Sequence, residues 1–393
     1  MAKLADSARF RDRLVADLER RELIRSKPVR EAFRAVPREL FVPHFAAREG
    51  LAAVYRDEAI LTKTGQHGLP LSSSSQPAIM ALMLEQLELR EGMRVLEVGA
   101  GTGYNAALLS LLVGVRGRVV SVDVDREIAA AARRALKEGG YRVRVVHTDG
   151  RAGFPNAAPY DRIIVTASTE EVPRAWSRQL ADGGLLEAPL RLDRAGMQVI
   201  PVLRKARAGF RSVRAVAGGF MPLRDAGDDD GLPPQEPGLL VTDLTRNGPE
   251  PFAHLTGAAL QTLSQAAKRR LLATALGEPR QRRLGLKANG DALGLYLSLT
   301  LPKSRLVTTF PSFAIGAIGR DGRSLAVIEL FRPERPTIAA LQAYGHREAE
   351  HFLLDRVGEW ARRGRPGPSD LRISIAYDQD RPRLAVRWPP PRP

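Results

Sequence analysis

A short apolar segment that ends in a carboxylate and three closely spaced glycines constrains this chain more than any other stretch. Residues 94–104 read Arg-Val-Leu-Glu-Val-Gly-Ala-Gly-Thr-Gly-Tyr, and helix-forming residues 105–112 follow at once. Gly99, Gly101 and Gly103 allow a strand to turn sharply into a helix, and they let the backbone approach a ligand closely. Because many α/β proteins carry one glycine-rich turn, its meaning depends on the segments around it.

Strand-like and helix-like segments alternate along the chain after residue 93. The apolar, strand-like runs are 94–98, 118–122, 143–147 and 162–166, and helix-like segments between them include 105–113 and 126–137. Strands separated by helices of this length form βαβ units, which build a mostly parallel sheet with helices on both faces. The sequence therefore predicts an α/β fold with a Rossmann-like, doubly wound sheet.

The segment before residue 90 is expected to be an N-terminal helical part of the same domain. Apolar spacing predicts helices over residues 7–23 and 29–35. The prolines of residues 36–43 predict a rigid, extended connection, and the chain up to residue 71 reads as loops and short strands.

An acidic stretch rich in proline and glycine, residues 225–237, divides the chain and reads as a linker or a long surface loop. The expected domains are therefore 1–224, including the segment 1–90, and a C-terminal α+β domain over 238–393. In the second domain we expect helices over 257–276 and 347–363, and strands over 293–300, 306–310, 325–331, 371–376 and 384–387.

The composition limits which kinds of site and partner are expected. The 393 residues contain no cysteine, which excludes disulfides, thiolate metal sites and cysteine nucleophiles, and no apolar run approaches the length of a membrane span. We therefore expect no metal site, no membrane association and a cytoplasmic location. The formal charge is +16, and residues 238–393 contribute 24 Lys or Arg against 14 Asp or Glu. This balance could attract nucleic acid, a membrane surface or acidic peptides, or it could be a solvated arginine-rich surface.

Three carboxylates follow or end the first three strand-like runs. Glu97, Asp123 and Asp149 are expected at the carboxyl edge of the sheet, where doubly wound folds bind ligands. Asp123 follows the last glycine by about twenty residues, the spacing of an acid that accepts ribose hydroxyls. Each carboxylate alone could equally be a loop acid or a helix cap. A carboxylate just before the glycines suits a cationic ligand, and S-adenosylmethionine, with its amino group and sulfonium, fits this pattern.

A run of four serines precedes the helix predicted from residue 78. Residues 71–77 read Leu-Ser-Ser-Ser-Ser-Gln-Pro, and the proline suits the first turn of that helix. The serines could cap the helix, or they could face a substrate at its entrance.

The sequence resembles the protein-L-isoaspartate O-methyltransferases from about residue 29 to residue 223. The shared motifs occur in the same order, and they are 36–43, 75–77, 95–103, 149–150, 158–161, 164–167, 179–180 and 220–223. The resemblance implies a methyltransferase that uses S-adenosylmethionine to esterify a carboxylate of a peptide or protein containing aspartate or isoaspartate. It implies that Ser75 faces the substrate carboxylate. Ser72, Ser73, Ser74 and Gln76 are further candidates for contact with the substrate, and for the serines helix capping and loop solvation are the alternative. The cofactor residues that it implies are Glu97, Gly99, Gly101, Gly103, Asp123, Asp149 and Gly150. We also expect their neighbours Thr102, Val124 and Thr166 to contact the cofactor.

Two departures from the family affect the expected substrate. The residues before Ser75 differ from the usual Gly-Gln-Thr-like lead, and the chain adds about 160 residues beyond the usual end of the family domain. Both departures are similar to an actinobacterial subgroup that methylates an aspartate of a constrained precursor peptide in lanthipeptide and graspetide pathways, which leads to aspartimide or isoaspartate. That function is our first hypothesis, and general repair of isoaspartate in damaged proteins is the alternative. An RNA-modifying enzyme is a third and weaker hypothesis, because no RNA-binding motif is present.

Overall fold

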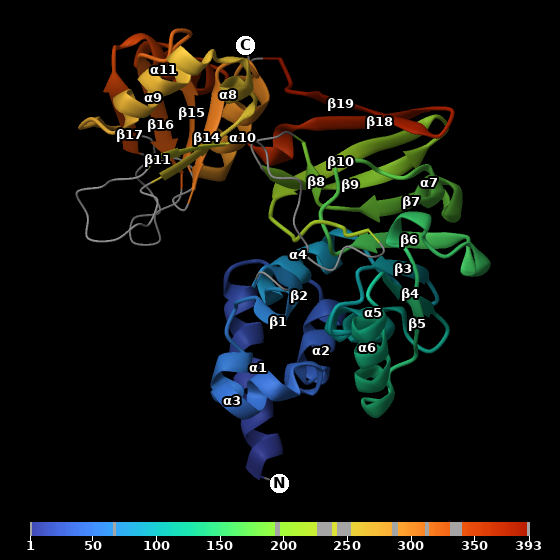
Figure 1. Ribbon diagram of the computed structural model, residues 1–393. Coiled ribbons are helices and arrows are strands. Elements are labelled where there is room, and N and C mark those ends of the chain that lie inside the picture. Colours follow the sequence, from blue (N-terminus) through green and yellow to red (C-terminus); the bar gives the residue numbers. More distant parts are fainter. Residues whose placement is uncertain are drawn as a thin grey trace.

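Two large β-sheets organise the chain (Figure 1). The computed structural model describes residues 2–65, 68–192, 197–225, 238–241, 253–284, 290–310, 314–330 and 340–390. The first sheet has the strand order β19-β18-β10-β9-β7-β6-β3-β4-β5, with β8 beside β9, and the second has the order β11-β12-β14-β15-β16-β17-β13. None of the described helices is long and apolar enough to cross a membrane.

The centre of the first sheet is parallel, as the alternating pattern predicted. Its parallel strands are β3 (Arg94–Val98), β4 (Arg118–Asp123), β5 (Val143–His147), β6 (Tyr160–Val165) and β7 (Leu180–Glu187). Antiparallel strands extend it, and they are β8 (Leu190–Arg191), β9 (Gln198–Ala206), β10 (Gly209–Ala217), β18 (Arg372–Asp378) and β19 (Arg381–Arg387).

Helices cover both faces of this sheet. On one face, Val95 of β3 and Ile164 of β6 share a core with α4 (Pro77–Gln86), α5 (Tyr104–Val113) and α6 (Arg126–Glu138). On the other face, Leu96 and Ile163 share a core with α7 (Arg174–Gln179) and α10 (Gly290–Thr300). The predicted Rossmann-like doubly wound fold is confirmed.

The N-terminal segment is more helical than the sequence predicted. It contains α1 (Ala2–Arg20), α2 (Lys27–Ala35), the 3-10 turn η1 (Arg38–Phe41), α3 (Pro43–Val54) and the hairpin of β1 (Ile60–Thr64) and β2 (Pro70–Ser74). The two expected helices are present, but the extended connection over residues 36–43 is wrong. Pro43 begins a helix instead of interrupting one, because the first helical position needs no N–H donor.

The second sheet is antiparallel. Its strands are β11 (Gly238–Val241), β12 (Ala253–Thr256), β13 (Arg280–Arg283), β14 (Leu306–Phe310), β15 (Ala314–Ile318), β16 (Ser324–Glu329) and β17 (Ala340–Gly345), and the helices packed with it are α8 (Ala258–Thr262), α9 (Gln265–Ala275) and α11 (Glu348–Arg362). The expected helix over 257–276 is two helices, because Ser264 interrupts it and caps α9 by accepting a hydrogen bond from Ala267 N–H at 3.2 Å.

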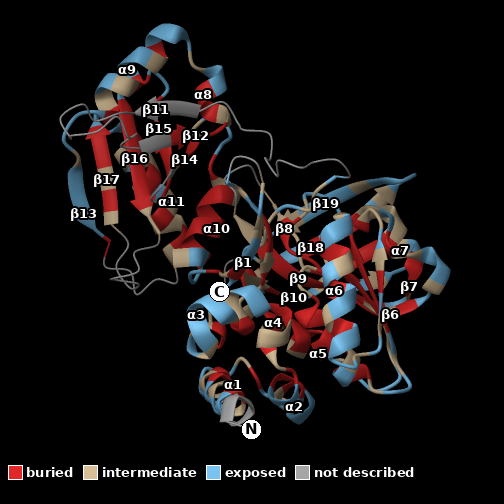
Figure 2. Cartoon of the chain, turned by 60° about the horizontal axis from the view of Figure 1, so that its bottom comes forward, coloured by how far each residue is buried: buried red, intermediate tan, exposed pale blue. Residues whose placement is uncertain are grey.

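The strand expected over residues 293–300 is wrong, because this segment belongs to helix α10. Leu295 of α10 packs into the core of the first sheet, whereas Leu293, Tyr296 and Leu297 pack into a core of the second. The leucines at positions 293, 295, 297 and 299 alternate with other residues, which is the pattern of a strand, and a helix buried on several sides does not show the 3.6-residue periodicity of a surface helix. Figure 2 shows α10 buried, whereas the outer faces of α6 and α9 are exposed.

The last two strands of the chain join the first sheet instead of the second. Phe210 of β10 pairs with Ile375 of β18, and Ile373 N–H donates to Ser212 Oγ at 2.9 Å across 161 residues of sequence. Residues 238–393 therefore contribute to both sheets. The linker expected over 225–237 lies, apart from Asp225, outside the described residues and stays a prediction.

Candidate active site

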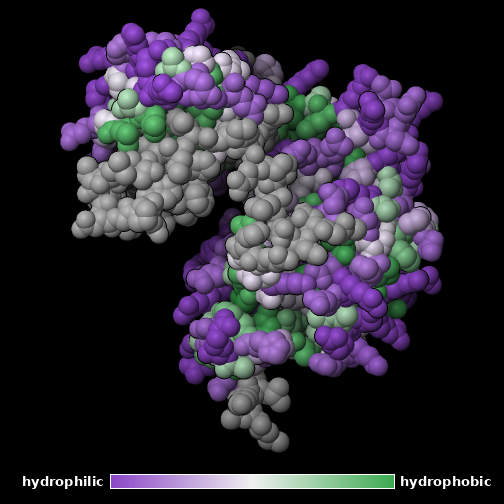
Figure 3. Space-filling model, viewed as in Figure 1, coloured by the Kyte–Doolittle hydropathy of each residue, from purple (hydrophilic) through white to green (hydrophobic). Residues whose placement is uncertain are grey.

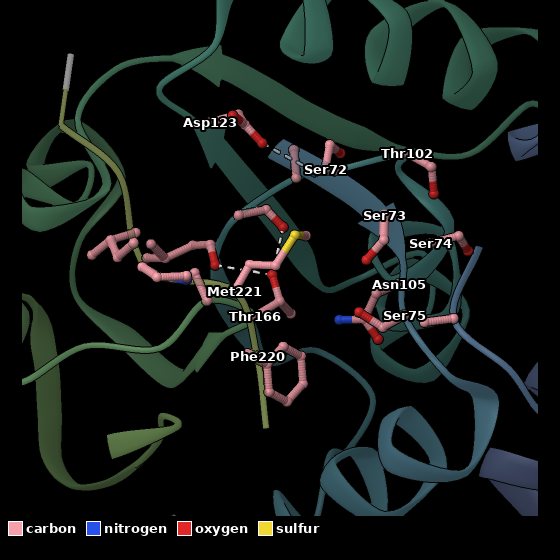
Figure 4. A pocket seen from close by; sticks show the side chains of 18 of the residues that line it. Ser72, Ser73, Ser74, Ser75, Thr102, Asn105, Asp123, Thr166, Phe220 and Met221 are labelled. Carbon is pink, nitrogen blue, oxygen red and sulfur yellow. Dashed lines mark hydrogen bonds between the residues drawn. The ribbon is translucent and has the colours of Figure 1, made fainter. Parts of the chain in front are cut away.

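A cavity of about 650 Å³ lies at the carboxyl ends of the central parallel strands (Figure 4). Its walls come from the glycine turn after β3, the loop after β4, the serine run of β2, and residues 217–224. In Figure 4, Ser73, Ser74, Ser75 and Thr102 lie on one side of the cavity, and Thr166, Phe220 and Met221 lie on the other. The cavity therefore brings the predicted cofactor turn and the predicted substrate entrance together.

The glycine turn depends on the absence of side chains. Gly99, Gly101 and Gly103 have φ values of +100°, +50° and +91°, which L side chains rarely adopt. The hydroxyl of Thr166 donates to the carbonyl oxygen of Gly99 at 2.7 Å, and Thr166 lines the cavity beside the turn. Gly103 is the N-cap of α5 and lies behind the lining, whereas Thr102 is part of it.

Asp123 ends β4 at the cavity wall, next to Val124. Its two carboxylate oxygens accept backbone N–H groups, Oδ2 from Gly101 and Oδ1 from Asp125, both at 3.0 Å. Burial raises the pKa of Asp123, and the two backbone donors oppose that shift. Each carboxylate oxygen keeps a second lone pair, so this side chain can still accept the two hydroxyls of a ribose.

Glu97 does not line the cavity, although the sequence placed it in the cofactor turn. It is fully buried and accepts hydrogen bonds from Asn105 Nδ2 at 2.8 Å and from Ser121 Oγ at 2.5 Å. Burial raises the pKa of Glu97 to about 7. Strand alternation could have indicated this position, because Glu97 lies two residues after Val95 and therefore on the face of β3 that packs against α4, α5 and α6.

Asn105, in the first turn of α5, is a cavity residue that the sequence reasoning missed. Its Nδ2 is held by Glu97, and its buried Oδ1 has no hydrogen-bond partner within the described part of the chain. Buried polar atoms are nearly always paired, so an unpaired amide oxygen at a cavity wall indicates a ligand that donates a hydrogen bond.

Of the neighbouring residues Asp149 and Gly150, only Gly150 is part of the cavity wall. Gly150 lines the cavity, and a Cβ built on it would lie 2.5 Å from Val98 Cγ1, so that position needs glycine. Asp149 lies outside the lining, where its Oδ1 accepts the N–H of Arg151 at 2.9 Å.

The serine run and Gln76 all line the cavity. Capping of α4 is carried out by another residue: Asp57 Oδ1 accepts the N–H of Ala78 at 2.8 Å, and no serine side chain caps the helix. Gln76 is tied to the same residue, because its Nε2 donates to Asp57 O at 3.0 Å. The hydroxyls of the run are thus not used as helix caps.

Arg38 holds the serine run from behind, and the sequence reasoning missed it. Its side chain is fully buried, and burial lowers its pKa. Nε lies 3.4 Å from Ser74 Oγ. The guanidinium donates to five backbone carbonyls, those of Val54 at 2.8 Å, Arg56 at 3.1 Å, Glu58 at 2.9 Å, Ser74 at 3.3 Å and Ser75 at 3.0 Å. The only hint in the sequence is that Arg38 lies within the family motif 36–43.

The opposite wall is fixed by hydrogen bonds to its backbone, one pair from a side chain and one pair from another backbone segment. Gln198 makes two hydrogen bonds with the backbone of Phe220, Nε2 to the carbonyl oxygen at 3.0 Å and Oε1 from the N–H at 2.8 Å. Ser168 N–H donates to Met221 O, and Leu223 N–H donates to Ser168 O, both at 2.7 Å. Phe220 and Met221 therefore present a rigid apolar surface to the cavity.

Comparison with known proteins identifies this arrangement. The model of the family described as protein-L-isoaspartate(D-aspartate) O-methyltransferase matches residues 9–227. The chain belongs to this family. A relative from Ignicoccus hospitalis, named protein-L-isoaspartate O-methyltransferase, is 40% identical over 211 residues, which cover 53% of this chain and 95% of the relative. A solved protein-L-isoaspartate O-methyltransferase aligns with a TM-score of 0.52 at 25% identity over 95% of this chain and 99% of its own.

The protein is therefore an S-adenosylmethionine-dependent O-methyltransferase, and its cavity fits that cofactor. The glycine turn leaves the backbone bare, Asp123 supplies a carboxylate with free lone pairs, and Asn105 Oδ1 needs a donor. A second relative, the protein-L-isoaspartate O-methyltransferase of Thermotoga maritima, is 41% identical over 181 residues, 46% of this chain and 56% of the relative.

Proposed function

We propose that this enzyme methylates the free carboxylate of L-isoaspartyl residues in polypeptides, as its relatives are named to do. The observation that carries the proposal is the contact between the serine run and the glycine turn. The carbonyl oxygen of Ser73 lies 3.4 Å from the position of a Cβ on Gly101, so acceptor and cofactor sites share one wall.

Seven of the ten residues assigned to the cofactor line the cavity. Gly99, Gly101 and Thr102 would hold its amino-acid end, Asp123 and Val124 its ribose, and Gly150 the side of its base, with Thr166 fixing the turn. Glu97, Gly103 and Asp149 would support these groups from behind. When bound, S-adenosylmethionine supplies an electrophilic methyl group, whose transfer to a carboxylate oxygen gives a methyl ester and S-adenosylhomocysteine.

The acceptor needs orientation more than activation. A carboxylate is already ionised at pH 7, so it needs no general base to become a nucleophile. Ser75 is proposed to donate its hydroxyl to one carboxylate oxygen, with Ser72, Ser73, Ser74 and Gln76 around it. The apolar side chains of Phe220 and Met221 help to exclude water, and a fixed acceptor oxygen lowers the entropic part of the barrier.

A precursor-peptide enzyme that methylates an ordinary aspartate is the second candidate. The uninterrupted serine run favours it, because it could adapt the entrance to one partner. The strands added by residues 238–393 do not separate the two candidates, because a solved protein-L-isoaspartate O-methyltransferase aligns over 95% of this chain. The curated relatives and the family model favour the isoaspartyl substrate.

The two candidates are separated by offering three peptides that differ in the linkage at one aspartyl residue or in ring closure. The enzyme is incubated with S-adenosylmethionine and an isoaspartyl peptide, its linear aspartyl twin, or the aspartyl peptide closed by a side-chain lactam. We expect mass increase by one methyl group only on the isoaspartyl peptide, lost in Ser75→Ala. Methylation of the closed aspartyl peptide alone would replace the first candidate by the second.

A further inference from the structure

The first half of β10, together with β18 and β19, leaves one face of the first sheet uncovered, although Ile200 and Val202 of β9 are buried on that same side. In β18, Ile373 and Ile375 are buried, whereas Arg372, Ser374 and Ala376 between them are exposed. Ile373 and Ile375 belong to the core that includes α7 and α10. The opposite side is the one that α4, α5 and α6 cover over the parallel strands, and these helices do not bury it over β18 and β19.

Several exposed arginines lie on this uncovered face. Strands β9, β10, β18 and β19 together contain eight Arg or Lys and one Asp. Residues paired directly across a sheet point to the same side, and residues two apart along a strand do so too. The exposed arginines that this register places on one side, here named the arginine face, are Arg204, Arg211, Arg372, Arg381, Arg383 and Arg387.

Two pairs on the arginine face oppose like charges directly. Arg211 of β10 pairs with Arg204 of β9, and Arg372 of β18 pairs with Arg387 of β19. Like charges in direct opposition destabilise a sheet. The single acidic side chain within these four strands is Asp378, and it is already in contact with Arg383. The face therefore carries a positive charge that its own described strands do not neutralise.

We propose that the arginine face docks an acidic segment of the polypeptide substrate, away from the residue that is methylated. This proposal rests on the proposed function for the identity of its partner. β19 is the outer strand of the sheet, so an extended segment can lie along its edge and meet arginines at alternate positions. The exposed residues of this face include no aromatic ring, which a sheet surface that binds single-stranded RNA uses for stacking. Figure 3 shows hydrophilic side chains gathered over the β18–β19 hairpin.

The docking segment must be separated from the methylated residue by a minimum length of chain. Gln198 lines the cavity at the start of β9, and Arg204 lies six residues further along that strand. At roughly 3.3 Å per residue this is about 20 Å. A flexible linker of about 12 residues between the isoaspartyl residue and an acidic tail spans this distance.

The test compares three peptides on the full-length enzyme. One is a short neutral isoaspartyl peptide, the second adds the linker and a glutamate tail, and the third has a serine tail instead. We expect the glutamate tail to lower KM by about fivefold or more at low salt and to lose that advantage at high salt. The double variant Arg204→Glu/Arg387→Glu should abolish the advantage while kcat for the short peptide stays the same.

A matched variant tests whether the tail advantage depends on where the arginines lie or only on the net charge of the protein. Arg9→Glu/Arg269→Glu reverses two exposed arginines on α1 and α9, so its charge equals that of the first double variant. It should keep the tail advantage. Because each reversal on the arginine face replaces a like-charge pair by an opposite-charge pair, Arg204→Glu/Arg387→Glu should also raise the melting temperature, which a loss of fold would not do.

A direct binding measurement tests the docking proposal independently of the proposed function. Fluorescence anisotropy of a labelled glutamate tail without isoaspartate measures docking even if no peptide is methylated. Equal affinity in both double variants, or tighter binding of a single-stranded RNA than of the glutamate tail, would overturn the proposal.

Discussion

The hydroxyl of Thr166 occupies the space that a side chain on Gly99 would need. A Cβ built on Gly99 would lie 2.5 Å from Thr166 Oγ1, and the same oxygen donates to the Gly99 carbonyl at 2.7 Å. The end of β6 thus fixes the turn after β3, and two neighbouring parallel strands together define the cofactor end of the cavity.

Gly99→Ala should weaken cofactor binding without unfolding the protein. The substitution adds the clash with Thr166 and the strain of a non-glycine residue at φ +100°. We expect the Kd for S-adenosylhomocysteine, measured by calorimetry, to rise by about tenfold or more, since 1.4 kcal/mol is a factor of ten. Gly183→Ala is the control, because Gly183 has φ +72° with nothing within 4 Å of a Cβ. Equal affinity in the two variants would show that the contact with Thr166 is unimportant.

Asp123→Asn should reduce cofactor affinity more than stability. The amide keeps the shape of the side chain but replaces one acceptor oxygen by a donor, facing N–H groups that need an acceptor. Hydrogen bonds to a charged group contribute about 1.5–3 kcal/mol, so we expect the Kd for S-adenosylhomocysteine to rise roughly tenfold to a hundredfold. Asp161→Asn is the counterpart, because Asp161 accepts the N–H of Arg94 at 2.8 Å outside the cavity. A similar loss of affinity in both variants would contradict the role of Asp123.

Arg38→Lys should impair binding of the acceptor peptide while leaving binding of the cofactor almost unchanged. An ammonium has three donors and cannot serve five carbonyls, so the serine run should lose part of its support. We expect KM for an isoaspartyl peptide to rise by about tenfold, while the Kd for S-adenosylhomocysteine changes by less than about twofold. Arg38→Met leaves all five carbonyls without this donor and should cost several kcal/mol of unfolding free energy, roughly 1–3 for each buried group left unpaired. A lysine variant in which KM is unchanged would show that Arg38 has no influence on the acceptor site.

The local parts of this site could be predicted from the sequence, and the long-range parts could not. The glycine turn, Asp123 and Gly150 follow from strand ends that lie close to one another in any doubly wound sheet. Arg38 reaches carbonyls up to 37 residues away, and nothing at residues 37–39 indicates which carbonyls these are. The segment of helix α10 predicts a strand because leucine recurs at every second position from Leu293 to Leu299, and only the packing of α10 between the two sheets overrides that alternation. The pairing of β18 with β10 depends on residues so distant in sequence that no local pattern encodes it.

Glu187 should destabilise the protein at neutral pH. It is fully buried in β7, and neither carboxyl oxygen has a hydrogen-bond partner in the described structure. Burial raises the pKa of Glu187 well above its ordinary value of 4.5. The folded state then holds a proton that the unfolded state releases above 4.5, so stability falls as pH rises toward the raised pKa, by about 1.4 kcal/mol per pH unit.

Glu187→Gln removes this titration and should make the protein more stable than the parent at pH 8, with a smaller difference at pH 5. Glu187→Val, which removes the polar group, should be more stable still, by about 1–3 kcal/mol. Urea unfolding at the two pH values measures both effects, with the exposed Glu91→Gln as a neutral comparison. A difference between parent and Glu187→Gln that does not change with pH would disprove the assignment.

The pairing of β10 with β18 affects how the protein is made on the ribosome. Residues 1–225 contain the whole glycine turn and the cavity, yet β10 gains its outer neighbour only when residues near 375 have been synthesised. At about 5–20 residues per second, some 160 residues take roughly 10–30 s. During that interval the nascent chain exposes the open edge of β10 and one side of Phe210, a state in which strands of neighbouring chains can pair. Translation speed over residues 226–371, or a chaperone bound there, should therefore influence the yield of this enzyme more than that of a shorter relative such as the one from Ignicoccus hospitalis, 95% of which lies within its 211-residue match.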